Sequence, residues 1–175
     1  MKKLLSLCFI LMLSVSLVAC GQKLEEAPVD EALSGSNASV SKVETSSSVK
    51  YLFDGYLTTK LPKGTVGSDA SINADSTLFS FAKGDVVILD VSINIEGTSN
   101  EEVLAKVKES LKFSSASDAG SITIDDVKFS GVNRPDFGYT EFSAHKAGCD
   151  ITVKIYADMK DDVVKDFIKN TEFLF

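Results

Sequence analysis

Residues 139–157 read YTEFSAHKAGCDITVKIYA, and this stretch decides the class of fold. In its second half apolar and polar side chains alternate, and a period of two predicts a β-strand with one buried face. Lys146-Ala147-Gly148 supplies a turn, so residues 139–145 and 149–157 are expected to pair as an antiparallel hairpin. An antiparallel sheet of this kind buries one face and leaves the other at least partly wet.

Further strands are predicted along the chain. Residues 51–53 and 56–61 flank Asp54-Gly55, a dipeptide typical of a tight hairpin turn. Additional strands are expected at residues 78–82, 86–95, 122–124 and 127–129. Residues 64–76 and 114–120 are rich in Gly, Ser, Asp and Asn and are predicted to be loops. The buried face of residues 86–95 is expected to hold Val87, Leu89, Val91, Ile93 and Ile95.

Two helices complete the predicted domain. Ser99 and Glu102 have the spacing of a capping box, which begins a helix by satisfying free backbone donors. Its apolar stripe is expected to be Val103, Leu104, Val107 and Leu111, with Glu102 and Lys106 as an ion pair one turn apart. A second helix is expected at residues 160–170, with Val163, Val164, Phe167 and Ile168 buried. The fold class that follows is α+β, with a largely antiparallel sheet and two main helices.

The N-terminus indicates where the protein resides. Two lysines precede an uncharged apolar stretch at residues 4–19, which is too short for the roughly 30 Å hydrocarbon core and is typical of a secretory signal. The stretch ends in Leu17-Val18-Ala19-Cys20-Gly21, which resembles the bacterial lipobox. The resemblance implies cleavage before Cys20 and a lipid anchor on its sulfur, so that the protein faces the extracytoplasmic side of the cell membrane. The alternative is an ordinary signal peptide with a chance cysteine.

These features predict three parts: a lipoprotein signal at 1–19, an acylated Cys20 with a disordered Ser-rich linker at 20–50, and a single domain at 51–175. The 18 basic and 25 acidic side chains give a net charge of −7, and losing Lys2 and Lys3 with the signal takes it to −9. A chain this acidic lacks the basic face of a nucleic-acid binder.

The order of elements in residues 51–175 resembles the PsbP-like fold, which is shared by the photosystem subunit PsbP, the Ran-binding protein Mog and many bacterial lipoproteins. Four stretches carry the resemblance: YLTTKLPKG at 56–64, SNEE at 99–102, GYTEF at 138–142 and FIKNTEF at 167–173. The resemblance implies an α+β domain around an antiparallel sheet. It brings no catalytic residue, because the bacterial members have no agreed activity.

Few residues suit catalysis or metal binding. His145 is the only histidine, and Cys149 is the only thiol left once Cys8 is removed and Cys20 acylated. A Cys149–His145 nucleophile would require the two to meet across the hairpin, whereas a buried cysteine beside an exposed turn histidine is the favoured interpretation. Asp69, Asn73 and Asp75 resemble part of a calcium loop, but the EF-hand pattern fails after them. The sequence therefore predicts no enzyme, no cofactor and no metal site. A paired-carboxylate glycosidase is left open, although a domain of 125 residues without Trp offers little platform for a sugar.

The remaining candidate site is the polar face of the sheet, where Asp90 and Asn94 are also expected to lie. The candidate partner-binding residues there and on the adjoining loop are Arg134, Asp136, Phe137, Glu141, His145, Lys154 and Tyr156. The leading hypothesis is a non-catalytic binding or accessory module for an envelope protein or wall component. The alternative hypothesis is a small-ligand carrier with an apolar pocket between sheet and helices.

Overall fold

The structure is a computed structural model that describes residues 40–72 and 75–175. The predicted signal peptide and the acylated Cys20 lie outside the described residues. The strands are β1 (Val40–Glu44), β2 (Ser48–Phe53), β3 (Leu57–Pro62), β4 (Thr65–Ile72), β5 (Ser76–Lys83), β6 (Val86–Asn94), β7 (Ser117–Ile124), β8 (Val127–Arg134), β9 (Tyr139–Lys146), β10 (Cys149–Ile155) and β11 (Glu172–Phe173). The helices are α1 (Asn100–Ser110), the short 3₁₀ helix η1 (Pro135–Phe137) and α2 (Asp162–Asn170).

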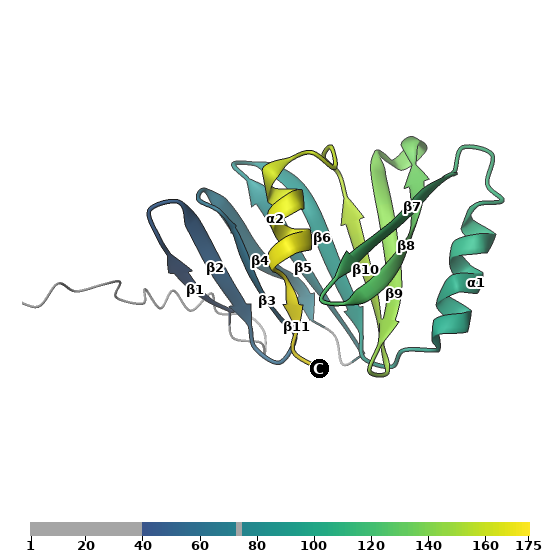
Figure 1. The fold of residues 1–175 in the computed structure, drawn as a ribbon, viewed down its shortest axis with the longest axis horizontal. Helices are drawn as coiled ribbons and strands as arrows, with labels where there is room; N and C mark the ends of the chain where they lie inside the picture. The colour runs from purple at the N-terminus through teal and green to yellow at the C-terminus, as the bar shows by residue number, and fades with distance from the viewer. Residues whose placement is uncertain (1–39, 73–74) are drawn as a thin grey trace, which may run out of the picture.

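The described residues form an α+β fold built on two antiparallel sheets (Figure 1). The smaller sheet has the order β1-β2-β3-β11, and the larger one has the order β4-β5-β6-β10-β9-β8-β7. Most neighbours in the larger sheet are consecutive in the chain, but β10 returns to pair with β6. That return places the 139–157 hairpin beside a strand that precedes α1.

The core lies between the two sheets and is rich in aromatic side chains. Phe81 of β5 contacts Phe53 of the smaller sheet and Phe167 of α2, with ring centroids 5.6 and 5.5 Å apart. All three rings are fully buried. The inner face of the larger sheet is therefore covered by the smaller sheet and by α2.

Helix α1 lies on the other side of the larger sheet, beside β8 and β9 at one end of the molecule (Figure 1). Its start is confirmed: the Glu102 backbone N–H donates to the Ser99 hydroxyl at 3.2 Å. Of the predicted apolar stripe, only Val103 is buried. Glu102 and Lys106 do not form the predicted ion pair. Instead, the Lys106 Nζ lies 3.8 Å from the Asp150 carboxylate. Helix α1 therefore faces polar side chains of the sheet.

The predicted hairpins are confirmed. Residues 51–53 end β2 and residues 57–61 lie in β3, while Tyr56, predicted to begin the second strand, lies with Asp54 and Gly55 in the turn between them. The 139–157 hairpin pairs as β9 and β10, with Cys149 opposite Lys146. The second helix is α2, whose start is fixed by the Asp161 carboxylate accepting from the Val163 N–H.

Three polar segments predicted to be linker or loop are strands. Strand β1 and part of β2 occupy residues 40–50, so the predicted linker is wrong there. Residues 64–76 contain β4, and residues 114–120 contain the start of β7. Strands β1, β4 and β7 are each at the edge of a sheet, where one side of the strand has no neighbour and polar side chains are common. In addition, bulges in β4 and β7 interrupt the alternation of side chains by which a strand is recognised in a sequence.

The predicted buried face of residues 86–95 is also corrected at both ends. A register shift opposite Phe81 and Ala82 buries Ile88 and leaves Val87 exposed by 42%. Ile95 lies beyond the last residue of β6 and is exposed by 43%. The inner face between these positions is as predicted.

Candidate functional site

The face of the larger sheet that points away from the core is here named the open face. Alternation along β10 buries Ile151 and Val153, so Asp150, Thr152 and Lys154 lie on the opposite side. The neighbours of β10 are β6 and β9, and their register sets Asp90, Lys154 and Glu141 in one row across three strands. The open face is therefore polar, and its side chains are held on a hydrogen-bonded scaffold.

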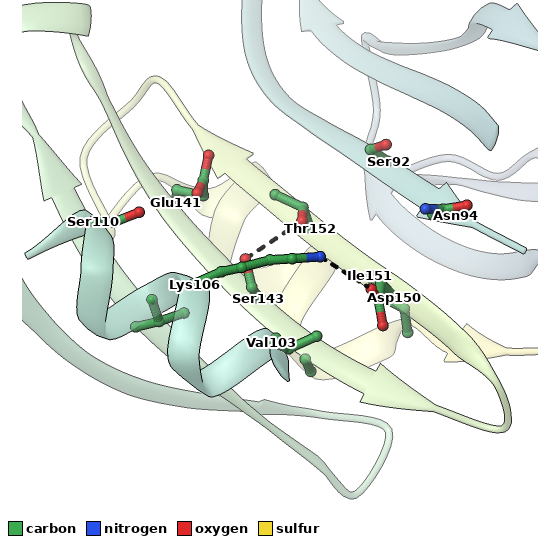
Figure 2. Close-up of a pocket in the computed structure, with 12 residues that line it drawn as sticks. Ser92, Asn94, Val103, Lys106, Ser110, Glu141, Ser143, Asp150, Ile151 and Thr152 are labelled. Atoms are coloured by element: carbon green, nitrogen blue, oxygen red, sulfur yellow. Dashed lines mark hydrogen bonds and ion pairs between the residues drawn. The ribbon is translucent and has the colours of Figure 1, made fainter. Parts of the chain in front are cut away.

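A trough runs over the open face and consists of two adjoining hollows that share Ser92 and Thr152. The first, of about 230 Å³, lies beside α1 (Figure 2). Its lining includes Lys106, Ser110, Glu141, Ser143, Asp150 and Asn94. The second, of about 460 Å³, includes Ser76, Leu78, Asp90, Lys154 and Tyr156 in its lining. Both volumes together are typical of a ligand site rather than of a water-sized gap.

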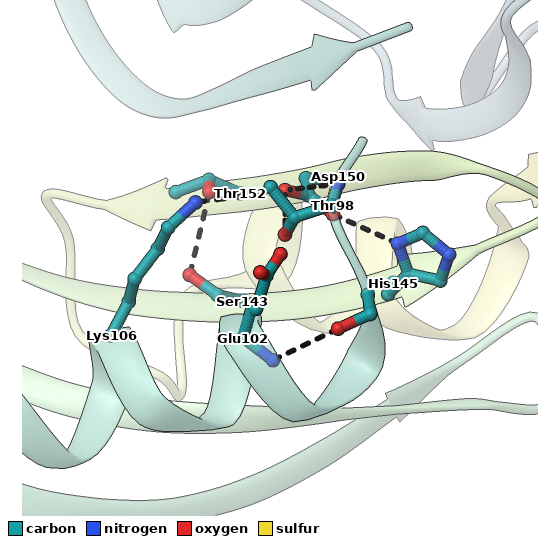
Figure 3. A network of polar contacts seen from close by, with 8 residues as sticks. Thr98, Glu102, Lys106, Ser143, His145, Asp150 and Thr152 are labelled. Atoms are coloured by element: carbon teal, nitrogen blue, oxygen red, sulfur yellow. Dashed lines mark hydrogen bonds and ion pairs between the residues drawn. The ribbon is translucent and has the colours of Figure 1, made fainter. Parts of the chain in front are cut away.

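Asp150 joins α1 to the sheet at one end of the trough (Figure 3). The Thr98 N–H and hydroxyl donate to its carboxylate at 3.2 and 2.9 Å, and His145 Nδ1 lies 2.8 Å from it. Burial opposes ionisation, but the hydrogen bonds from His145 and Thr98 and the charge of Lys106 together lower the pKa of Asp150. Asp150 is thus an ionised anchor that fixes the residues leading into α1.

Asp90 has a similar arrangement in the second hollow. Its carboxylate accepts from the Ser80 hydroxyl at 2.6 Å and from the Tyr156 hydroxyl at 2.9 Å. Partial burial and the hydrogen bond to the Asp90 carboxylate raise the pKa of Tyr156 to about 12. The Tyr156 phenol therefore stays a proton donor at neutral pH, and its ring is held at the edge of the trough.

Aromatic rings extend from Tyr156 toward η1. Tyr139 meets Tyr156 edge-on with ring centroids 5.8 Å apart, and Phe137 stacks on Tyr139 at 6.0 Å. The Lys154 ammonium lies 5.1 Å from the centre of the Tyr139 ring. Phe137 is exposed by 67%, so its ring is accessible from solvent. We name Phe137, Tyr139 and Tyr156 the aromatic run.

The structure brings most of the predicted partner-binding residues to the open face. Glu141, Lys154 and Tyr156 line the trough, and His145 lies next to it on Asp150. Phe137 belongs to the aromatic run, and Asp136 is its exposed neighbour in η1. Whether these residues bind a partner stays a prediction.

Arg134 is placed differently from the predicted site. Its guanidinium donates to the Ser110 hydroxyl at 2.8 Å and lies 5.6 Å from the centre of the Phe113 ring. Arg134 therefore ties the C-terminal end of α1 to β8, and its planar donor group is engaged within the chain.

The trough also contains residues that the sequence prediction did not include. Ser92, Ser143 and Thr152 follow from strand alternation, which was the available signal. Lys106 and Ser110 gave no such signal, because nothing in the sequence places α1 on the polar side of the sheet.

The Cys149–His145 pair is not formed. Cys149 is buried on the inner face of β10, whereas His145 contacts Asp150 on the open face. The burial of Cys149 and the nearby Asp150 charge raise the pKa of its thiol, which leaves it a poor nucleophile. Because the two side chains lie on opposite faces of the sheet, His145 does not activate Cys149 as a nucleophile.

Cys149 instead lines an apolar hollow of about 350 Å³ at the end of the sandwich. The other lining residues come from the β2–β3 turn, the end of β6 and the C-terminus: Asp54, Gly55, Tyr56, Ile93, Ile95 and Phe175. This hollow shares no lining residue with the trough.

Within residues 40–72 and 75–175, no three His, Cys, Asp or Glu side chains are grouped so as to hold a metal ion. No helix in that part of the chain is long and apolar enough to span a membrane. Comparison of the chain with protein-family models, curated proteins and solved structures finds no match.

Proposed function

We propose that this protein is an extracytoplasmic lipoprotein, anchored to the cell membrane through Cys20, whose folded domain is a non-catalytic binding module. The anchor rests on the resemblance of residues 17–21 to the lipobox. Two acyl chains on one cysteine would give stable anchoring, because each buried CH₂ contributes about 0.8 kcal/mol. The partner is an envelope component within reach of the membrane surface.

The observation that carries the binding function is the trough on the open face. Its acidic side chains Asp90 and Asp150 are already fixed by neighbouring hydroxyl, amide and imidazole groups. A site whose polar groups are held in place binds with little loss of side-chain entropy. Helix α1 forms one wall of the trough, so a ligand there would contact both a helix and four strands.

The experiment is site-specific photocrosslinking in intact cells with the full chain. A photoreactive residue replaces Lys106, which lines the trough and has 65% of its side chain exposed. The matched control replaces Lys108, which is exposed on the same helix and does not line the trough. We expect a discrete adduct from position 106 and little from position 108, because helical residues two apart do not share a face.

A second experiment tests the anchor. Cys20→Ser removes the acylated sulfur, so cells fed an alkyne-labelled fatty acid should label the wild-type chain and leave the variant unlabelled. A variant that still takes up the label would contradict acylation at Cys20, and equal adducts at positions 106 and 108 would contradict binding in the trough.

The apolar hollow beside Cys149 supports a second candidate function, a carrier of a small apolar ligand. Its volume of about 350 Å³ suits a compact molecule. The hollow lies at the end of the sandwich, whereas the space between the larger sheet and α2 is filled by Phe81 and Phe167. A carrier function would therefore use the sandwich end.

Thiol modification of Cys149 measures access to this hollow. Because burial raises its pKa, Cys149 should react with an iodoacetamide reagent far more slowly than after unfolding in urea. If the hollow holds apolar ligands, 1-octanol should slow the reaction further, as measured by mass spectrometry of the peptide that contains Cys149. A rate unchanged by octanol would count against the carrier.

A further inference from the structure

The chemistry of the trough indicates the class of its ligand, and the inference rests on the proposed binding function. The charges that line it are those of Lys106 and Lys154 against Asp90, Glu141 and Asp150. Each cation faces an acid: Lys106 lies 3.8 Å from Asp150, and Lys154 is directly opposite both Asp90 and Glu141 in the strand register. Two positive and three negative side chains leave a net charge of −1, so the trough favours a ligand without strong net charge.

Hydroxyl and amide groups make up most of the remaining polar lining. They come from four neighbouring strands and from α1, and they are Ser76, Ser92, Asn94, Ser143, Thr152 and Ser110. Such groups both donate and accept hydrogen bonds, as do the hydroxyls of a sugar. Glu141 adds a carboxylate for which no hydrogen bond is found among the described residues, and a carboxylate can accept from two adjacent hydroxyls.

The aromatic run supplies the apolar part of the site. A sugar ring has a face of C–H bonds, and these pack on the electron-rich face of an aromatic ring. Tyr156 lines the second hollow, and Tyr139 and Phe137 continue from it. The absence of Trp from the sequence is therefore no obstacle, because three smaller rings are assembled next to the polar trough.

An extended peptide fits this site less well. Peptides that bind to sheets usually add a strand at a free edge, where unpaired backbone groups are available. The trough lies over β5, β6, β10 and β9, which are internal strands with neighbours on both sides. Recognition here must come from side chains, as it does for saccharides.

We infer that the trough binds an uncharged saccharide chain, with Glu141 and the hydroxyl and amide groups of the lining contacting sugar hydroxyls and the aromatic run stacking on a sugar ring. The volumes of the two hollows, about 230 and 460 Å³, suit a short oligosaccharide segment.

The test is isothermal titration calorimetry on the full-length protein in detergent micelles. The probes are soluble oligosaccharides of β-linked glucose, of β-linked N-acetylglucosamine and of β-linked galactose. We expect saturable binding of at least one of them. Glu141→Gln and Phe137→Ala should each weaken that binding by about tenfold, the usual effect of losing one charged hydrogen bond or one ring contact.

Two variants provide matched controls. Glu172→Gln changes an exposed glutamate on β11, and Leu52→Ala removes an apolar side chain that is exposed by 38% on β2 of the smaller sheet and lines neither hollow. Both should leave the affinity unchanged. Circular dichroism of all four variants checks that the fold is kept.

Two results would overturn the inference: no saturable binding of any of the three probes, or binding that neither Glu141→Gln nor Phe137→Ala weakens. If position 106 captures only protein or peptide in the crosslinking experiment while the probes fail, the trough remains a binding site and the saccharide assignment is wrong. If neither experiment gives a signal, the proposed binding function fails as well.

Discussion

Phe81→Ala is expected to lower the free energy of unfolding by about 3–5 kcal/mol, the usual cost of truncating a fully buried phenylalanine. The Phe81 ring connects three parts of the core: it contacts Tyr51 and Phe53 of β2 and Phe167 of α2. Its loss leaves a cavity that these elements could close only by shifting toward the larger sheet.

Urea unfolding followed by circular dichroism measures this effect. The matched control is Val86→Ala on the adjoining strand β6, because Val86 is exposed by 63% and its truncation should change stability by less than about 0.5 kcal/mol. A loss of less than about 1 kcal/mol for Phe81→Ala would show that the two sheets do not share one core.

Asp150→Ala is expected to destabilise the attachment of α1 to the sheet by about 1–3 kcal/mol, since it removes a carboxylate that accepts several hydrogen bonds. The change leaves Thr98, His145 and Lys106 without this acceptor. Hydrogen exchange of the backbone amides in α1 should become faster, while exchange in the core strands β6 and β10 changes less.

The pH dependence of this effect has a defined sign. The pKa of Asp150 is lowered in the folded protein, so the network is fully stabilising above the ordinary aspartate pKa of about 3.9. Its contribution is lost as the pH falls through the lowered value. The stability difference between wild type and Asp150→Ala should therefore shrink as the pH falls through this acid range.

Asp85→Asn is the control for this prediction. Asp85 is exposed in the turn between β5 and β6, and no hydrogen bond or ion pair of its side chain is found within the described residues. Asp85→Asn should leave unchanged both the free energy of unfolding and the hydrogen exchange of the backbone amides in α1. If α1 exchanges equally fast in wild type and Asp150→Ala, Asp150 does not hold the helix in place.

Local signals allowed the central elements of the fold to be predicted from sequence. The Asp54-Gly55 turn, the alternation in β10 and the capping serine Ser99 each act over a few residues, and each is found in the structure. The edge strands β1, β4 and β7 were missed, because their sequences are polar and the bulges in β4 and β7 interrupt the period.

The candidate site was only partly predictable for a related reason. Alternation correctly placed Glu141, Lys154 and Tyr156 on one polar face. The pairing of β10 with β6, which brings Asp90 beside Lys154, joins residues far apart in the chain and leaves no local mark. The position of α1 depends on tertiary contacts such as Lys106–Asp150 and Arg134–Ser110, because the helix buries only Val103.

The central claim is that the trough beside α1 is the surface through which this protein binds its partner. The most direct measurement is the ratio of crosslinked adduct obtained from position 106 to that from position 108 in intact cells. A strong adduct at 106 with little at 108 is the result we predict. Equal yields at the two positions, or none at 106, would contradict the claim.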